Sequence, residues 1–394
     1  MRWQTAENRL RVAYLFGFAS LGSWMPMFTV WLEDHGLPKK HIGDISAIPW
    51  LVMLVIQPVW GIIADRIGIK KCFIVTTLVA VLAFVLMPAA GGYINTVVWM
   101  TVLFSLFNTP VLPLLDSITL GLAADGRIPS YAAFRFWGAP GFAAGALLTS
   151  WLISLWNIDV LFYLSALFLF LMWLTLTTLK VGQSISTGEP ARKGMGQLLK
   201  DPLLMMFLAV IVIISVAQSS SSFFLTVYLR ELGATPGVTG TALGVQALSE
   251  LPFYFLAAWL LKRTSSGRVV LIAIFGTVLR LLLYSLNGTA GWVIGIETLN
   301  GVTWTLLWIA SVEYVDKRVP ASWRTTGQSL LWAAYFGAGA IAGNVLSGRL
   351  HETMPMRSVF GINSVLAALA GIVAAGIFSR TRRRHQEIQP VSST

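Results

Sequence analysis

Twelve apolar runs, each long enough to cross a lipid bilayer, constrain this sequence more than any other feature. A helix needs about 20 apolar residues to cross roughly 30 Å of hydrocarbon. Unpaired backbone polar groups are costly in lipid, so runs of this length are expected to be α-helical. We therefore predict an all-α membrane protein with twelve transmembrane helices, at about 10–32, 42–64, 70–90, 94–122, 130–155, 158–179, 203–229, 238–261, 267–286, 291–315, 323–348 and 358–379.

The composition assigns these runs to a membrane rather than to the core of a soluble protein. The 394 residues are 56% hydrophobic and 11% charged, whereas soluble domains are about a quarter charged. The first run, from about Val12 to Leu32, has no small-residue cleavage site followed by a soluble domain. We expect a retained span there, not a secretory signal.

The sequence lacks the motifs of enzymes and metal sites. Its single cysteine, Cys72, excludes a disulfide framework and a cysteine-built metal site. The four histidines have no His-Glu-x-x-His spacing, and no phosphate-binding glycine loop ending in Gly-Lys occurs. No nucleophile–base set is recognisable. We expect no enzyme, no metal and no cofactor.

The longest polar break divides the chain near its middle, from Lys180 to Asp201, and it contains Gly, Ser and Pro. It indicates a cytoplasmic linker between two six-helix halves. The expected units are an N-terminal six-helix bundle at 1–179, the linker at 180–202, a C-terminal six-helix bundle at 203–379 and a basic cytoplasmic tail at 380–394.

The distribution of basic residues predicts the orientation. Of the 28 Lys and Arg residues, 21 fall in the segments on the side of the N-terminus, 5 fall on the opposite side, and Arg135 and Arg280 lie inside spans. Cytoplasmic loops carry the excess of Lys and Arg, so both termini are expected in the cytoplasm. The net charge of +11 is then explained by the orientation of the chain in the membrane. We therefore expect no nucleic-acid partner.

The two halves repeat each other. A parallel repeat of six helices implies two bundles related by an axis along the membrane normal, and such bundles rock around a central site. The matching segments are TVWLEDHG (29–36) with TVYLRELG (226–233), DGRIP (125–129) with DKRVP (316–320), and GFAAG (141–145) with GAIAG (339–343). The Gly-x-x-x-Gly spacing in GFAAG indicates close helix packing, although it is also faintly similar to a signature of antiporters.

The stretch GIIADRIGIKK (61–71), between the second and third spans, resembles the loop motif of the major facilitator superfamily. Its glycines permit a tight turn, Asp65 can accept hydrogen bonds from helix N-termini, and the basic residues can face anionic lipid. The residues that the resemblance assigns to this conformational loop are Gly61, Asp65, Arg66, Gly68, Lys70 and Lys71.

Three further stretches narrow the resemblance. YAAFRFWGAPGF (131–142), the region 228–263 and VLRLLLYSL (278–286) are similar to the branch of proton symporters that includes lactose permease and the phenylpropionate permeases. The resemblance implies import of a small solute with protons. It places Asp116, Arg135 and Glu250 at positions that hold the solute, and Arg280 at the position of a proton-coupling arginine.

The tenth span departs from that pattern. ETLNGVT (297–303) has Asn300 and Thr303 where the branch has titratable residues. Neither side chain can carry a proton. Coupling would therefore depend on Glu250 or Glu297, and uniport stays an alternative.

Four of the charges inside the membrane form two candidate pairs. Asp116 and Arg135 lie at similar depths on either side of a short loop, so a direct pair is feasible; it either lines the transport path or fixes helix packing. Arg280 and Glu297 also lie at matching depths, across the turn at 287–291, as a gating or coupling pair or as a structural bridge.

Glu250, near the centre of the eighth span, has no basic neighbour in the sequence. The spans contain three carboxylates but only two arginines. A carboxyl group that is removed from water and has no basic partner can take up a proton near neutral pH, whereas an arginine stays charged. Glu250 is the first candidate for the proton-carrying or solute-binding acid and Glu297 the second. The alternative is a permanently protonated acid in the core.

Several neutral side chains are further candidates. Gln246, Asn300 and Gln328 can hydrogen-bond a solute, and Trp137, like Trp304, Trp308 and Trp332, can stack on a ring unless it only packs or borders the membrane. QSSSS (218–222) is polar enough that part of it is expected to face a cavity, unless its serines bond back to their own helix.

Together these features predict a secondary transporter that functions as a monomer in a bacterial cytoplasmic membrane. Its expected partners are a small-molecule substrate, protons and the lipid bilayer. A sugar or glycoside and an aromatic carboxylate both fit the charges. Export of drugs, sugars or metabolites on the same fold is the main alternative, and a membrane sensor that transports nothing is a more distant one.

Overall fold

The computed structural model describes residues 2–128, 132–177, 198, 200–320 and 323–388. Within these residues it contains helices and no strand. Twelve of the helical segments are long and apolar enough to cross a membrane, which confirms the predicted number. They are 6–34, 39–64, 69–90, 94–123, 133–155, 160–177, 202–223, 236–263, 266–286, 290–318, 326–353 and 356–379.

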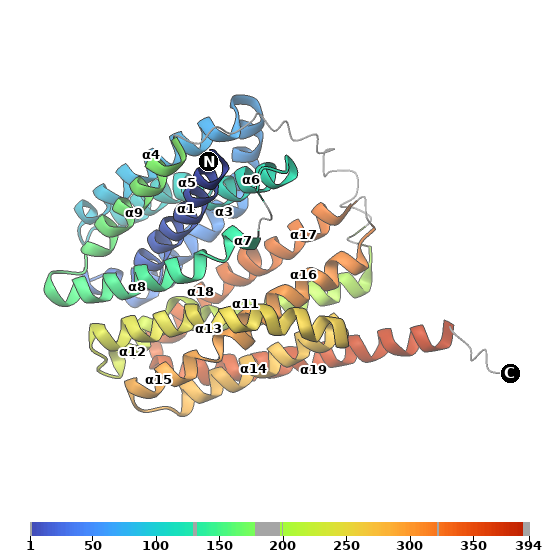
Figure 1. Cartoon of the computed structure of the whole chain (residues 1–394). Helices are drawn as coiled ribbons and strands as arrows, with labels where there is room; N and C mark the ends of the chain where they lie inside the picture. Colours follow the sequence, from blue (N-terminus) through green and yellow to red (C-terminus); the bar gives the residue numbers. More distant parts are fainter. Residues whose placement is uncertain (1, 129–131, 178–197, 199, 321–322, 389–394) are drawn as a thin grey trace.

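The first six spans form one bundle, shown in blue to green in Figure 1. Three of these spans are interrupted by short breaks, two of them at prolines, Pro26 and Pro110, which lack the N–H that continues a helix. The helices are α1 (Arg2–Trp24), α2 (Phe28–Asp34), α3 (Lys39–Ile67), α4 (Ile69–Leu86), the short η1 (Met87–Ala90), α5 (Ile94–Asn108), α6 (Val111–Ala124), α7 (Ala132–Arg135), α8 (Gly138–Leu155) and α9 (Val160–Thr177).

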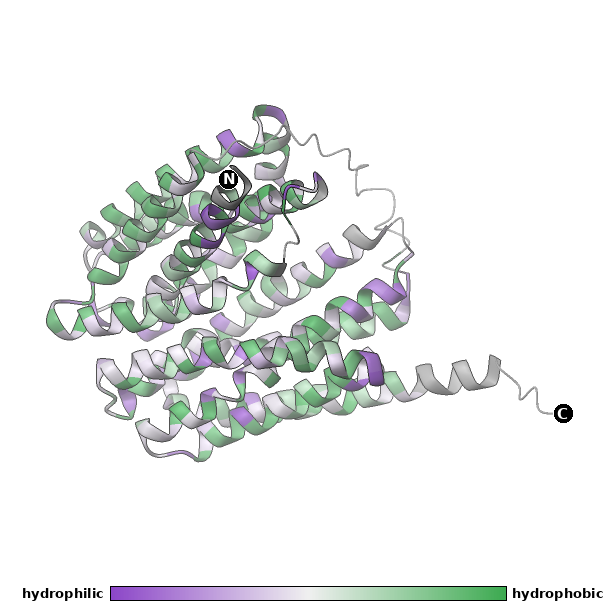
Figure 2. Ribbon diagram, in the orientation of Figure 1, coloured by the Kyte–Doolittle hydropathy of each residue, from purple (hydrophilic) through white to green (hydrophobic). Residues whose placement is uncertain are grey.

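The last six spans form the second bundle, shown in yellow-green to red. Two of them contain a π-helical segment in mid-span, η2 and η4. The helices are α11 (Pro202–Phe223), α12 (Leu225–Glu231), α13 (Pro236–Arg263), α14 (Ser266–Leu286), α15 (Ala290–Glu297), η2 (Gly301–Leu306), α16 (Leu307–Arg318), α17 (Arg324–Trp332), η4 (Ala333–Gly339), α18 (Ala340–Thr353) and α19 (Met356–Ile388). Figure 2 shows hydrophobic residues along most of the helix lengths, with many of the hydrophilic ones near helix ends.

The glycine repeat produces the same packing in both bundles. A Cβ at Gly145 of α8 would lie 2.1 Å from the Ala19 carbonyl oxygen of α1, and a Cβ at Gly343 of α18 would lie 2.8 Å from the Val216 carbonyl oxygen of α11. Only glycine allows the backbones to approach this closely. The close packing expected from Gly-x-x-x-Gly is thus present in each half.

The two bundles contact each other at one end, the end of the loops at 35–38, 156–159, 232–235 and 354–355, which we call the closed end. There α8 packs on α13 and α3 packs on α18. Gly43 and Gly348 form a close crossing, since a Cβ on Gly348 would lie 2.7 Å from the Gly43 Cα. Hydrogen bonds and ion pairs join the bundles at this end.

The repeated threonines join the bundles symmetrically. Thr29 donates its hydroxyl to the Phe223 carbonyl oxygen at 2.7 Å, and Thr226 donates to the Pro26 carbonyl oxygen at 2.5 Å. Each acceptor precedes the other threonine by three residues. The repeat in the sequence therefore corresponds to a two-fold relation between the halves.

The loop motif forms the turn between α3 and α4. Gly68 has a φ of 94°, which favours glycine, whereas Gly61 lies inside α3 rather than in the turn. Lys70 donates to the Thr177 carbonyl oxygen at 2.7 Å and so joins the turn to the end of α9. Arg66 and Lys71 are exposed. The side chain of Asp65 lies outside the described residues.

The expected unit boundaries fall close to helix ends. The helix α9 ends at Thr177 and α11 begins at Pro202. Most of the expected linker lies outside the described residues. The basic segment from 380 continues α19 as a helix to Ile388, so the described part of the expected tail is helical.

Candidate functional site

Arg135 lies near the start of the fifth span, in the N-terminal bundle, at the break between α7 and α8. Its guanidinium carbon lies 4.0 Å from the ring centroid of Phe18 in α1. A Cβ on Gly138 would lie 2.6 Å from the Arg135 Nη1, so the glycine that begins α8 makes room for the guanidinium. From this position Arg135 interacts electrostatically with Glu250 in the other bundle.

Asp116 is not the ion-pair partner of Arg135. Its Oδ1 accepts a hydrogen bond of 2.7 Å from the hydroxyl of Tyr14, which is fully buried. No ion pair joins Asp116 to Arg135 among the described residues. The similar depths of the two charges therefore did not lead to the direct pair that the sequence made feasible.

Glu250 of α13 is bonded within its own bundle and lies within electrostatic range of the other. Its Oε1 accepts a hydrogen bond of 3.2 Å from Asn300 Nδ2, and the same amide donates to the Gln246 carbonyl oxygen at 3.2 Å. Gln246 thus contributes its backbone here. Glu250 has a neutral donor from its own bundle and the charge of Arg135 from the opposite one.

Arg280 and Glu297 form a buried ion pair in the C-terminal bundle. The Nη2 of Arg280 lies 2.5 Å from Glu297 Oε2, and the exposed fractions of the two side chains are 5% and 0%. Tyr284 completes a triangle, because its hydroxyl accepts from Arg280 Nε at 3.0 Å and donates to Glu297 Oε1. The pair predicted from matching depths is present, and its role in coupling stays a prediction.

Asn300 connects this ion pair to Glu250. Arg280 Nη1 donates to Asn300 Oδ1 at 2.8 Å and to Thr303 Oγ1 at 3.0 Å. The two ends of the Asn300 amide therefore hold Arg280 and Glu250. A continuous polar path runs from the buried pair to the boundary between the bundles.

The polar segment 218–222 lies mainly inside the C-terminal bundle. Gln218 donates to Thr277 Oγ1 at 2.8 Å and accepts from the Tyr335 hydroxyl at 2.7 Å. Ser219, Ser220 and Ser221 are buried and donate to carbonyl oxygens of their own helix. The expected cavity face is therefore wrong for these residues, and the back-bonding alternative is right.

Aromatic rings gather beside the polar path. Trp308 makes an edge contact with Trp332 at 5.0 Å between ring centroids, and Trp332 stacks on Phe336 at 4.7 Å. Phe336 also stacks on Trp50 of the other bundle at 5.3 Å. Trp332 is 48% exposed. Such a surface offers π-faces to a ring-shaped solute.

Two other predicted residues have different surroundings. Gln328 donates to the Val312 carbonyl oxygen at 2.9 Å, a contact inside the C-terminal bundle. Trp137, just before α8, is 36% exposed. These contacts do not join either side chain to the path from Glu297 to Glu250.

Some features of the site were missed by the sequence reasoning. Tyr284 and Tyr335 had not been singled out, although Tyr284 follows Arg280 by one helical turn, which was a usable signal. The π-helical segments η2 and η4, which include Thr303 and Tyr335, had no sequence signal that we used. Such segments frequently mark functional sites.

The arrangement can move protons and hold a polar solute. Arg280 bonds directly to Glu297, and Asn300 joins Arg280 to Glu250. Arg135 interacts with Glu250 electrostatically. No group of three or more His, Cys, Asp or Glu side chains that could hold a metal ion occurs in the described part of the chain.

Known proteins resemble this chain over nearly its whole length. The model of the MFS_1 like family matches residues 8–362. The maltose permease of Geobacillus stearothermophilus is 27% identical, covering 98% of both chains. The probable 3-phenylpropionic acid transporter of Escherichia coli (strain K12) is 24% identical, covering 91% of this chain and 94% of that protein. The crystal structure of the nucleoside transporter NupG superposes with a TM-score of 0.83 at 16% identity, covering 95% of this chain and 99% of that one, and so shows the same fold.

Proposed function

Because the chain belongs to the MFS_1 like family of the major facilitator superfamily, we propose that it imports a small neutral polyhydroxylated solute, a sugar or glycoside, together with protons. Its twelve spans and its relatives identify a multi-pass membrane transporter. Alternating access around the boundary between the two bundles is the mechanism that such a repeat supports.

The observation that carries this proposal is the position of Glu250. It accepts from Asn300, which is bonded to the buried Arg280–Glu297 pair, and it interacts with Arg135 of the opposite bundle. A proton on Glu250 removes its negative charge, and the attraction between the bundles at mid-span then falls. Proton uptake and bundle movement are thereby linked through one carboxyl group.

Solute and proton act on the same contacts. While Glu250 is ionised, its charge attracts the Arg135 guanidinium across the boundary between the bundles. When Glu250 is protonated, Arg135 becomes a free donor for solute hydroxyls, and the carboxyl group can both donate and accept. The bound solute then contacts both bundles in place of the electrostatic attraction between Glu250 and Arg135. The solute and the proton therefore cross the membrane together. The Arg280–Glu297 pair holds Asn300 in position. Glu297 is the second candidate for the proton-carrying acid.

The charges at the boundary favour a neutral solute. Glu250 supplies one carboxylate and Arg135 one guanidinium within electrostatic range of each other, and these two charges stay balanced when the solute is neutral. The exposed face of Trp332, next to Phe336 and Trp308, suits the apolar face of a sugar ring. A relative is named maltose permease, which agrees with this choice.

An aromatic carboxylate is the second candidate. Arg135 can hold a carboxylate with two parallel hydrogen bonds, and a relative is named as a probable 3-phenylpropionic acid transporter. Trp137 and the aromatic cluster would then bind the ring of the solute.

We also propose the orientation and the cellular setting. The excess of Lys and Arg on the side of the N-terminus supports cytoplasmic termini, and the bacterial relatives support a bacterial cytoplasmic membrane. The closed end then faces outward, and the contacts there correspond to a state closed to the outside. The loop motif at 61–71, bonded to the end of α9 through Lys70, lies on the cytoplasmic side and helps to govern the exchange of states in a functional monomer.

A binding screen tests the solute class. Purified protein is heated with mono- and disaccharides, nucleosides and aromatic acids at acidic and at neutral pH, and the unfolding temperature is recorded. We expect stabilisation by a saccharide, since a ligand that binds the folded state stabilises it. The Arg135→Ala variant should unfold at the same temperature as the parent without solute and lose the solute shift. Stabilisation by aromatic acids alone would favour the second candidate, and a full saccharide shift in Arg135→Ala would exclude this site.

A further inference from the structure

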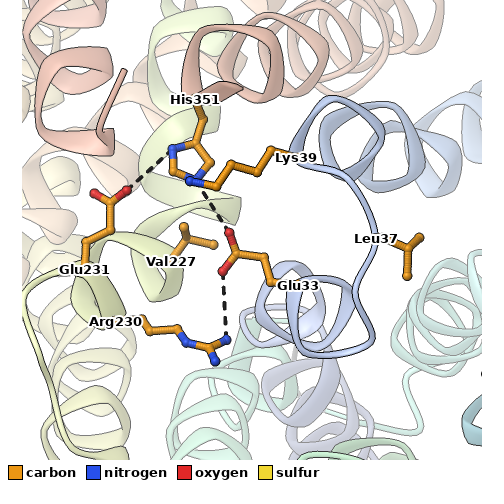
Figure 3. A pocket seen from close by; sticks show the side chains of 7 residues that line it. All are labelled: Glu33, Leu37, Lys39, Val227, Arg230, Glu231 and His351. Carbon is orange, nitrogen blue, oxygen red and sulfur yellow. Dashed lines mark ion pairs between the residues drawn. The ribbon is translucent and has the colours of Figure 1, made fainter. Parts of the chain in front are cut away.

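We propose that His351 is a second proton site, remote from Glu250, and that its protonation locks the two bundles together at the closed end. His351 lies in the last turn of α18 and its side chain is 2% exposed. Its Nε2 lies 3.5 Å from Oε1 of Glu33 in the opposite bundle, and its Nδ1 lies 3.5 Å from Oε1 of Glu231 in its own bundle. Figure 3 shows the ring between the two carboxylates.

The chemistry of imidazole makes this position sensitive to protonation. Both ring nitrogens of His351 are buried and make no hydrogen bond within the described residues. A neutral imidazole has one N–H and one lone pair. Between two carboxylates its lone pair must point toward a negatively charged oxygen, which is repulsive. The protonated ring has two N–H groups and can attract both carboxylates, so the arrangement suits the imidazolium form.

The surrounding charges favour the same form. Charged groups of three elements lie around the ring: Glu33 and Asp34 of α2, Arg230 and Glu231 of α12, and Lys39 of α3. Arg230 forms an ion pair with Asp34 and also lies 3.9 Å from Glu33. Glu33 and Glu231 both lie beside the ring, so a proton on His351 adds attraction to an acid of each bundle.

The remaining charged groups nearby belong to a separate cross-bundle pair. On α18 itself, Arg349 Nη2 lies 3.2 Å from Asp44 Oδ2 of α3, and His41 lies 3.9 Å from the same carboxylate. Glu352 on α18 is exposed. His41 and Asp44 are in one bundle, so a proton on His41 adds no attraction between the bundles and can only compete with Arg349.

A hollow gives protons a route to the ring. A cavity of about 360 Å³ is lined by Glu33, Lys39, Arg230, Glu231 and His351, among other residues. Of the two contacts of the ring, the one to Glu33 crosses between the bundles. Acid on the side of the closed end would therefore strengthen closure there, which adds a response to pH that does not involve the central acid.

His35 provides a matched comparison at the same end of the molecule. Its Nε2 lies 3.4 Å from Asp159 Oδ1, which also accepts from Trp31 Nε1 at 2.7 Å. All three residues belong to the N-terminal bundle. Protonation of His35 can strengthen that bundle internally and cannot bias the contact between the two bundles.

Distances between spin labels test the proposal in the full-length protein. Labels are placed at the exposed positions Lys40 and Glu352, on opposite bundles, after replacement of the buried Cys72. The ratio of closed to open molecules should fall about fivefold from about pH 5.5 to about pH 8, as expected for one partly buried ion pair of a titrating histidine.

Variants assign that shift to one contact. All variants are made in a Glu250→Gln background, which removes any pH response of the central acid. In this background the shift should vanish in His351→Gln and also in Glu33→Gln, which keeps the imidazole and serves if the first variant folds poorly. It should persist in the Glu250→Gln background alone and when His35→Gln or His41→Gln is added to it. An unchanged ratio in the parent, a shift retained in His351→Gln and Glu33→Gln, or a shift lost in Glu250→Gln would each overturn the proposal. The readout is a population and needs no solute, so it stands apart from the test of the transported substrate.

Discussion

Substituting Arg280, Glu297 or both should reveal how much each charge of this buried pair stabilises the protein in the presence and in the absence of the other. Neither side chain is more than 5% exposed, and Tyr284, Asn300 and Thr303 surround the pair. Removing one partner of such a pair costs about 3–5 kcal/mol, because the other charge stays buried without compensation. Replacing both partners with apolar residues is often close to neutral.

The two single variants should differ in size and in pH dependence. In Arg280→Met the isolated Glu297 can take a proton and stay hydrogen-bonded to Tyr284. We therefore expect the free energy of unfolding to fall by about 3 kcal/mol, the lower limit of the range. This loss should shrink as the pH falls, since protons then bind more readily. In Glu297→Leu the arginine cannot lose its charge, so the loss should approach about 5 kcal/mol and change little with pH.

Equilibrium unfolding in mixed micelles, followed by circular dichroism, provides the free energies for a double-mutant cycle. The double variant Arg280→Met/Glu297→Leu should cost less than either single variant. Losses below about 1 kcal/mol in both single variants, a size typical of exposed pairs, would refute the reasoning. So would a double variant whose cost equals the sum of the two.

Two further predictions concern the ends of the bundles. Burial raises the pKa of Asp201, but hydrogen bonds from Arg318, the Leu203 and Leu204 N–H groups and the arginine charge lower it overall. Asp201 therefore stabilises the protein above its unfolded-state pKa of about 3.9, and this contribution is lost as the pH falls through its lower folded-state pKa. Asp201→Asn should cost about 1–2 kcal/mol at neutral pH and nothing in strong acid, measured by unfolding in micelles; a cost independent of pH would contradict this. Gly348→Ala places a Cβ 2.7 Å from Gly43 Cα, so spin-label distances should show fewer closed molecules, and an unchanged population would contradict the close contact.

The spans and the repeat were predictable because they depend on local properties of the sequence. Hydropathy over about 20 residues finds a helix without knowledge of its neighbours. The threonines of the repeat, Thr29 and Thr226, were aligned in the sequence and make equivalent bonds in the structure. Counting residues from a span end also gave the matching depths of Arg280 and Glu297.

Depth alone could not assign the other partners. Asp116 and Arg135 lie at similar depths, but the α7–α8 break directs the guanidinium to Phe18 and toward Glu250, while Asp116 bonds to Tyr14. The direction in which a side chain leaves its helix depends on tertiary packing. The same reason applies to His351, which meets Glu231 of α12 within its own bundle and Glu33 of α2 only when the bundles close.

The account depends most on the claim that Glu250 couples proton and solute movement between the two bundles. The direct measurement follows proton flux and solute flux together in proteoliposomes with the saccharide identified by the binding screen. A downhill solute gradient should drive proton uptake in the parent protein. In Glu250→Gln the solute should still exchange across the membrane, whereas coupled proton uptake and accumulation against a gradient should both be absent. Undiminished proton uptake and accumulation in Glu250→Gln would contradict the account.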